Sequence, residues 1–118
     1  MALLLLGPLM AGVSGCSADS AAHPRNADPA QGQRLLAQYQ CGSCHTIPGV
    51  VAARGRVGPS LEAFGKRSYI AGHLPNGAEL LARWIVAPAA LVPGTAMPSM
   101  GVSPLDARHM AAYLGSLQ

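Results

Sequence analysis

Apolar positions recur at helical spacing in three stretches of the chain. The first begins at an Asp-Pro pair at 28–29, a capping residue followed by proline in the first turn, and predicts a helix to about Gln40. One face of this helix carries three residues at i, i+4 and i+7: Gly32, Leu36 and Tyr39. Because glycine inside a helix costs about 1 kcal/mol relative to alanine, we interpret Gly32 as a point where another helix comes close.

The other two stretches lie in the second half of the chain. Asn76, with Glu79 three residues on, is expected to cap a helix that runs through LLARWIVA and stops at Pro88. Ser103, followed by proline and by Asp106 at the third helical position, is expected to start a last helix with an apolar face.

The remaining sequence predicts loops and little sheet. Gly/Pro-rich loops are expected at 46–59 and 87–102, with a short helical turn at 60–64. β-branched residues are sparse, which argues against a large sheet. The pattern therefore predicts a small all-α domain of three to five short helices. With aromatic residues at only 4% of the chain, its core is thin, and a group that is not protein is expected to complete it.

The N-terminal apolar run differs from these helices. The stretch 2–13 has no charge and is shorter than the roughly 20 residues that span a bilayer, but it has the length of a signal-peptide core. The sequence Val-Ser-Gly-Cys at 13–16 resembles the lipobox of bacterial lipoproteins. We therefore expect a lipoprotein signal peptide at 1–15, lipid on Cys16, a flexible polar tether at 16–27, and one folded domain at 28–118.

An alternative keeps export but not the lipid. No Lys or Arg precedes the apolar run, unlike the usual signal peptide, and an ordinary signal peptide cut near Ala22 would leave Cys16 without a role. Both interpretations place the protein on the extracytoplasmic side of a bacterial membrane, and the lipoprotein interpretation anchors it there.

The charge of the chain is modest and basic. Eight Lys and Arg against five Asp and Glu give a formal net charge of +3. Four of the cations cluster in one segment and form a candidate docking patch for an acidic partner, with an ordinary solvated face as the alternative: Arg54, Arg56, Lys66 and Arg67. The sequence contains no nucleic-acid-binding motif.

The chemistry of the chain centres on C-G-S-C-H at 41–45. This spacing is typical of covalent c-type haem attachment. On a helical turn, positions i, i+3 and i+4 share one face, so Cys41 and Cys44 can each reach a porphyrin vinyl group while His45 points toward the iron.

Three other interpretations of this motif are a structural zinc site, a thioredoxin-like redox pair and a chance match. A structural zinc site needs four ligands, and Cys41, Cys44 and His45 supply three; His23, His73 or His109 would have to be the fourth, and none has a partner at ligand spacing. A thioredoxin-like pair needs strands around it, which the pattern does not predict. A chance match is the remaining alternative.

A second axial ligand is available in the stretch VPGTAMPSMG. It offers Met97 and Met100 on a loop stiffened by Pro93 and Pro98. The alternative is that these methionines fill gaps in the core, as we expect for Met110 on its helix face.

Residues 28–118 resemble a class I cytochrome c. The similarity rests on an ordered set of motifs: the first helix with Gly and an aromatic residue, CGSCH, GPSL, the helix with Trp, PGTAMP, and the last helix with an aromatic residue. More narrowly, the second half is similar to the haem c domain of caa3-type cytochrome c oxidase subunit II, here as a stand-alone lipoprotein.

This resemblance implies one covalent haem c and assigns its ligands. His45 would be the proximal ligand and Met97 the distal one, because the family ligand directly precedes proline. The carbonyl of Pro59 would accept a hydrogen bond from Nδ1–H of His45, and Trp84 would donate to a haem propionate or simply pack in the core.

The resemblance also implies a contact between the first and last helices. Gly32 and Tyr39 would meet Tyr113 and Leu114 where the two helices cross.

The resemblance further implies an electron carrier rather than an enzyme. The protein would cycle between Fe(II) and Fe(III) without a small-molecule substrate and pass electrons to a terminal oxidase. The alternatives are a cytochrome subunit that accepts electrons from a periplasmic dehydrogenase, and a haem sensor or peroxidase-like protein whose distal position opens.

Overall fold

Four α-helices and one small hairpin form the part of the chain that this computed structural model describes, residues 27–118. The helices are α1 (Pro29–Gln38), α2 (Ala78–Val86), α3 (Pro88–Leu91) and α4 (Pro104–Ser116). Two short 3₁₀ turns, η1 (Cys41–Ser43) and η2 (Phe64–Lys66), lie between α1 and the hairpin. Strand β1 (Tyr69–Ile70) pairs antiparallel with β2 (Leu74–Pro75). The predicted all-α class with three to five short helices is confirmed.

Local capping explains where the first and last helices begin. The side chain of Asp28 accepts a hydrogen bond from the Ala30 N–H at 2.8 Å, and proline follows in the first turn of α1. Ser103 caps α4 in the same way, accepting from the Asp106 N–H at 3.1 Å. Both predicted starts are therefore confirmed, although α1 ends at Gln38, two residues before the expected end.

Two expectations about the middle of the chain are wrong. Asn76 does not cap α2, since Gly77 is the N-cap; the Asn76 amide instead donates to the carbonyls of Phe64 and Arg67 at 3.2 and 2.9 Å. The Asn76 side chain therefore makes two hydrogen bonds to the turn at η2, instead of the one hydrogen bond that capping α2 would provide. The short helical turn forms at η2, beyond the expected 60–64.

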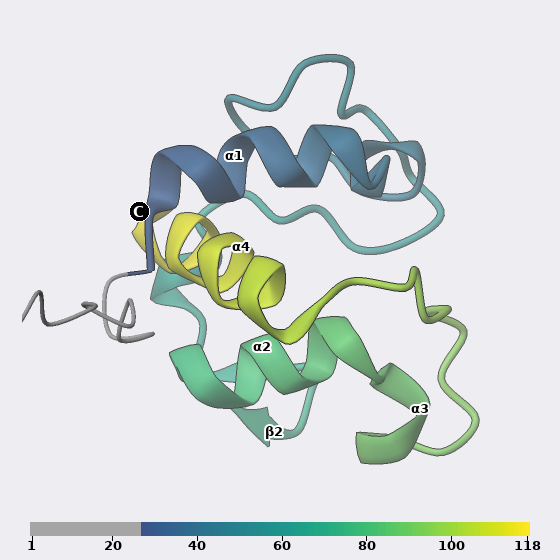
Figure 1. Cartoon of the computed structure of the whole chain (residues 1–118). Helices are drawn as coiled ribbons and strands as arrows, with labels where there is room; N and C mark the ends of the chain where they lie inside the picture. The colour runs from purple at the N-terminus through teal and green to yellow at the C-terminus, as the bar shows by residue number, and fades with distance from the viewer. Residues whose placement is uncertain (1–26) are drawn as a thin grey trace, which may run out of the picture.

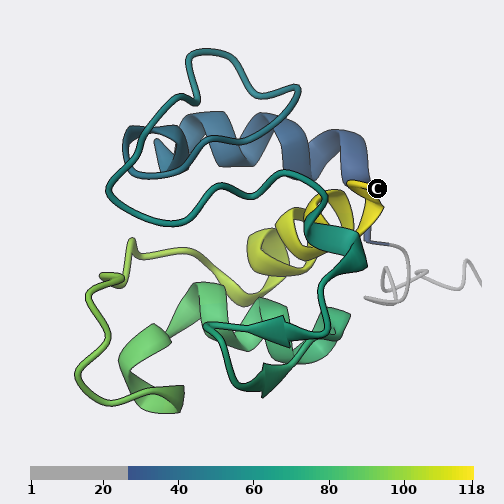
Figure 2. The ribbon, with the colours of Figure 1, turned by 180° about the vertical axis from the view of Figure 1, so that it is seen from behind.

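Helix α4 packs against both α1 and α2, and α1 crosses it in both views (Figures 1 and 2). At the crossing, a Cβ added to Gly32 would collide with the His109 carbonyl group and approach the Met110 nitrogen to 2.9 Å. The prediction that Gly32 marks a close helix approach is confirmed.

The residues expected at this crossing need a correction. Gly32 meets the backbone at His109, and the Tyr39 hydroxyl donates to Asp106 at 2.8 Å. The Tyr113 hydroxyl donates to the carbonyl of Pro48 at 2.6 Å. The crossing point along α4 therefore lies closer to the start of that helix than the resemblance implied.

A single apolar core lies between the helices and the loops. Its buried members come from α1, α2 and α4, and also from the loop after residue 45, which contributes Ile47, Val50 and Ala53. Figure 2 shows the hairpin on the face that is hidden in Figure 1. The predicted loop at 46–59 is present, whereas the predicted loop at 87–102 is interrupted by helix α3 at Pro88–Leu91, which Pro88 starts from its first helical position. Of the expected site residues, Pro59 lies on the first of these segments and Met97 on the second.

The predicted signal peptide and Cys16 lie outside the described residues, as does nearly all of the predicted tether. Within residues 27–118, the helices are too short or too polar to cross a membrane.

Candidate haem-binding site

The C-G-S-C-H segment forms the tight turn η1 directly after α1. Gln40 adopts a left-handed conformation with φ of 56°, which ends the helix and redirects the chain. The N–H groups of Cys44 and His45 both donate to the Cys41 carbonyl, at 3.2 and 3.1 Å. The two thiols are free and half-buried, and burial raises the pKa of the Cys41 thiol.

The imidazole of His45 is held by its Nδ1 atom. Nδ1 lies 2.6 Å from the Pro59 carbonyl oxygen. A carbonyl only accepts, so Nδ1 carries the proton and donates, which leaves Nε2 with the lone pair that a metal ligand needs. This is the contact that the resemblance implied for Pro59.

Gly58 lies against the face of the same imidazole. A Cβ at this position would collide with the ring, coming within 2.8 Å of Nδ1 and 2.9 Å of Nε2. The absence of a side chain at Gly58 is therefore what lets the chain pass close enough for Pro59 to accept from His45.

The loop after His45 is fastened to the turn η1 by backbone contacts. Gly55 N–H donates to the Gly42 carbonyl at 2.9 Å, and Gly58 N–H donates to the Cys44 carbonyl at 2.8 Å. A Cβ at Gly42 would strike Ala53, and one at Gly55 would strike the backbone of Ser43 at 2.5 Å. Glycines on both segments thus allow two stretches of backbone to lie in direct contact.

The opposite side of the site is the loop between α3 and α4. Thr95 closes a turn by donating from its N–H to the Val92 carbonyl at 3.1 Å, and its Oγ1 accepts from the Met97 N–H at 3.3 Å. The Ser99 hydroxyl donates to the Val86 carbonyl at the end of α2, at 3.0 Å. Met97 is half-buried against the core, whereas Met100 is 46% exposed.

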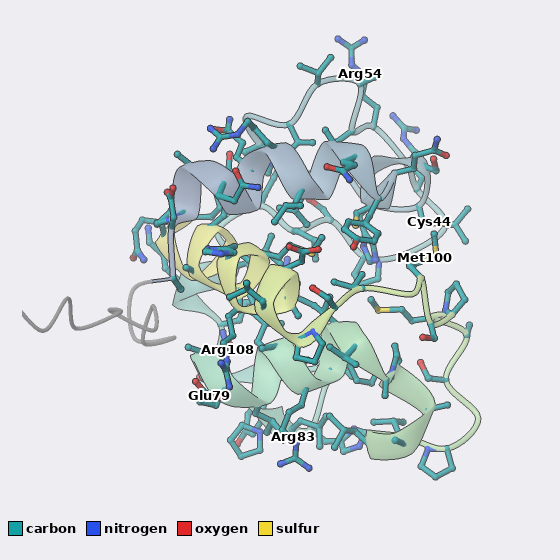
Figure 3. The ribbon with its side chains drawn as sticks, in the orientation of Figure 1. Cys44, Arg54, Glu79, Arg83, Met100 and Arg108 are labelled. Carbon is teal, nitrogen blue, oxygen red and sulfur yellow. The ribbon has the colours of Figure 1, made fainter. Side chains whose placement is uncertain are left out.

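One cavity of about 690 Å³ brings these groups together. Its wall includes every described residue that the sequence analysis placed in the site: Cys41, Cys44, His45, Pro59, Trp84 and Met97. Met100 and the fully buried Met110 also line it. Figure 3 shows Cys44 and Met100 on the same side of the molecule.

The donor set of this cavity fits haem c and does not fit zinc. Two thiols, one imidazole and the thioethers of Met97, Met100 and Met110 line an apolar cavity whose volume lies in the range of ligand and cofactor sites, roughly 300–1,000 Å³. Within residues 27–118, no three His, Cys, Asp or Glu side chains are grouped so that they hold a metal ion. His109 instead accepts from the Asp28 N–H at 2.8 Å, and His73 is exposed.

Sequence reasoning missed the contacts of Arg67 and Gly58 in this wall. Arg67, which we placed in a surface patch, lines the cavity; its guanidinium donates to the carbonyl oxygens of Ser60 and Glu62 and lies 5.4 Å from the Phe64 ring centroid. It is the only Lys, Arg, Asp or Glu among the lining residues. Gly58 was visible only as the glycine of GPSL, and that motif does not show that the glycine touches the imidazole.

Comparison with known proteins agrees with this geometry. The cytochrome c family model matches residues 29–118. Among curated proteins, cytochrome c oxidase subunit 2 of Alkalihalophilus pseudofirmus is 37% identical over 89 residues, which is 75% of this chain but 25% of that subunit. The chain therefore spans about a quarter of the length of this relative. Its motifs, its cavity and the match over nearly all described residues show that this chain belongs to the cytochrome c family and is an electron carrier with one covalently bound haem c.

Proposed function

We propose that the protein is an exported, lipid-anchored cytochrome that delivers single electrons to a terminal cytochrome c oxidase. One observation carries the proposal for the site: the thiols of Cys41 and Cys44, the imidazole of His45 and the thioether of Met97 line the same cavity. The similarity to part of a cytochrome c oxidase subunit 2 supports an oxidase as the partner.

In this proposal each lining residue has a defined task. Cys41 and Cys44 would hold the haem through thioether bonds, and His45 and Met97 would be the ligands of its iron. The Pro59 carbonyl holds His45 in the tautomer that leaves Nε2 free to bind, and Gly58 provides the room for this contact. Trp84, buried at 8% exposure in the cavity wall, would donate to a haem propionate through its indole N–H.

Haem c, when bound, supplies a one-electron Fe(III)/Fe(II) couple. The thioether of Met97 and the apolar wall both favour the less charged ferrous state and therefore raise the reduction potential. With His45 and Met97 both bound to the iron, no position on the iron would remain for a small-molecule substrate. It acts as a carrier and not as an enzyme, although it can be a subunit of an oxidoreductase complex.

We also propose that an acidic redox partner docks on the loop after His45, which is hydrogen-bonded to η1 through Gly55. Arg54 and Arg56 are exposed there, beside Val57, which is 85% exposed and lies at the rim of the cavity. Arg67 is committed to the cavity wall and drops out of the patch that the sequence indicated. In Figure 3 Arg54 lies on this loop, well away from Arg83 on α2.

Lipid on Cys16 and the polar tether would confine this carrier to a membrane surface. Two-dimensional diffusion along that surface raises the effective concentration at a membrane-bound oxidase. Mass spectrometry of the mature N-terminus tests the anchor: a diacylglycerol-modified Cys16 is expected, and an N-terminus near residue 22 contradicts it.

Oxygen uptake tests the proposed delivery of electrons. Reduced holoprotein is added to oxidase-containing membranes of the source organism, and uptake is followed at low and high salt. The double variant Arg54→Glu/Arg56→Glu is expected to raise the KM about tenfold at low salt with little change in kcat, because charge reversal impairs encounter with an acidic surface. Arg83→Glu is the matched control and is expected to behave like the wild type.

The outcomes separate the alternatives. If the membranes leave the reduced protein unoxidised while a periplasmic dehydrogenase reduces its ferric form, the protein is a dehydrogenase acceptor instead. If Arg83→Glu raises the KM as much as the double variant, the docking surface is wrong while delivery to the oxidase stands.

A further inference from the structure

Tyr39 makes a contact that the haem chemistry does not require. It is the C-cap of α1, half-buried, and lies two residues before Cys41. Its hydroxyl donates to Oδ2 of Asp106 at 2.8 Å, across 67 residues of sequence. Asp106 lies in the first turn of α4, directly after the loop that carries Met97.

The contact is built into the cap of α4. Ser103 Oγ accepts from the Asp106 N–H, as in a capping box. In that motif the acidic side chain would reach back to the N–H of the capping residue, but here Asp106 accepts from Tyr39 instead. The pKa of Tyr39 is raised, mainly by its hydrogen bond to Asp106. Burial and the negative charge of Asp106 raise it further, and the backbone of Ser103 lowers it. The Tyr39 hydroxyl therefore supplies the donor that the Asp106 carboxylate would find at Ser103 in a capping box.

The hydrogen bond from Tyr39 to Asp106 lies between the two segments that carry the proposed iron ligands. Other contacts between α1 and α4 involve Asp28 and Gly32, both of which meet His109 farther along α4. Tyr39 instead connects the end of α1, two residues before Cys41, to Asp106 in the first turn of α4. This turn follows the loop that carries Met97. Val102 is 5% exposed and lines the cavity, so the Met97 loop is anchored to the core directly before the cap of α4.

We propose that Tyr39 is a positioning residue that sets the distance between the segment of His45 and the segment of Met97, and so holds Met97 on the iron. This inference rests on the proposed assignment of Met97 as axial ligand. Without the hydroxyl, the cap of α4 loses the partner of its carboxylate, and the Met97 loop gains freedom to move away from the cavity.

The test is imidazole binding to the ferric holoprotein. Imidazole displaces a weakly held methionine and removes the Met–iron charge-transfer band, so its apparent affinity reports how firmly Met97 is held. Tyr39→Phe is expected to raise this affinity about tenfold, the equivalent of losing one hydrogen bond to a charged acceptor. Asp106→Ala is expected to have a similar effect, and the double variant no more than either alone.

Tyr113→Phe is the matched control. It also deletes one half-buried hydroxyl with a single long-range partner, the Pro48 carbonyl at 2.6 Å, but that partner belongs to the loop after His45. Both variants are expected to lower the urea midpoint to a similar extent, and only Tyr39→Phe is expected to change imidazole affinity.

Each other result overturns a specific claim. Equal imidazole affinity in Tyr39→Phe and Tyr113→Phe means that Tyr39 only stabilises the fold, and the positioning role is wrong. A wild type that binds imidazole as readily as Met97→Ala, or that shows no Met–iron band, contradicts the assignment of Met97 instead.

Discussion

The segment around His45 and the segment around Met97 line the same cavity, but their backbones are held by different means. On the His45 side, Gly42, Gly55 and Gly58 have no room for a Cβ, since the neighbouring backbone or imidazole occupies that space. On the Met97 side, Gly94 and Gly101 have open space around them and positive φ values of 82° and 71°. Close packing is the constraint at Gly42, Gly55 and Gly58, whereas a positive φ without close neighbours is the constraint at Gly94 and Gly101.

The hydrogen bonds that hold the backbone also differ between the His45 segment and the Met97 segment. The His45 side has direct backbone pairs from Gly55 to Gly42 and from Gly58 to Cys44, reinforced by Thr46 Oγ1 donating to the Gly55 carbonyl at 3.1 Å. The Met97 loop is held by a turn and by the hydroxyls of Thr95 and Ser99. The imidazole side is therefore fixed by backbone contacts, while the Met97 loop has fewer of them and would depend more on the proposed ligation of Met97 and on the proposed role of Tyr39.

The largest effect is expected from removing the thioether. Met97→Ala should abolish the Met–iron band, open the iron to external ligands, and lower the reduction potential on the order of 100 mV, within the ~0.8 V that axial ligands span. Met100→Ala should change none of these, since Met100 is half-exposed at the rim. Spectroscopy and potentiometry of the two holoproteins decide it, and the reverse result would transfer the ligand role to Met100.

A pair of glycine variants tests the difference between the two sides. Gly55→Ala should lower the free energy of unfolding by about 3 kcal/mol, because the new methyl group overlaps backbone that cannot move away. Gly94→Ala should cost only about 1–2 kcal/mol, the penalty for a positive φ in open space. Urea unfolding of both holoproteins measures this, and equal losses would show that the two loops are held alike.

A smaller effect is expected at the attachment of the Met97 loop to α2. Ser99→Ala removes the hydrogen bond to the Val86 carbonyl and should cost about 1 kcal/mol. Because this contact belongs to the less constrained side, the variant should also bind imidazole slightly more tightly than the wild type. If only stability falls, the attachment supports the fold without restraining Met97.

The smallest effect concerns alkaline pH. The folded-state pKa of Tyr39 is raised above its unfolded value near 10, mainly by its hydrogen bond to Asp106. Its contribution to stability is therefore fully present below pH ~10 and is lost as the pH rises through the folded value. Urea midpoints of wild type and Tyr39→Phe should converge above pH 10; a constant difference would show that Tyr39 does not titrate with unfolding.

Much of this protein was determined by local sequence. Capping residues placed the starts of α1 and α4, because a side chain within three residues satisfies the free N–H groups there. The spacing of C-G-S-C-H and the order of the later motifs indicated haem c, and the comparisons show the family. These features depend on residues that are close in sequence, so a pattern can reveal them.

Tertiary structure decided what depends on residues far apart in sequence. Asn76 looks like a cap locally, but two carbonyls near η2 accept its amide instead. Arg67 looks like a surface charge, but its guanidinium finds carbonyls in the cavity wall. Tyr39 reads as one aromatic residue on a helix face, and only the crossing of α1 and α4 brings it to Asp106. Polar side chains with several available partners take the one that the folded chain brings within reach, and sequence spacing does not encode that distance.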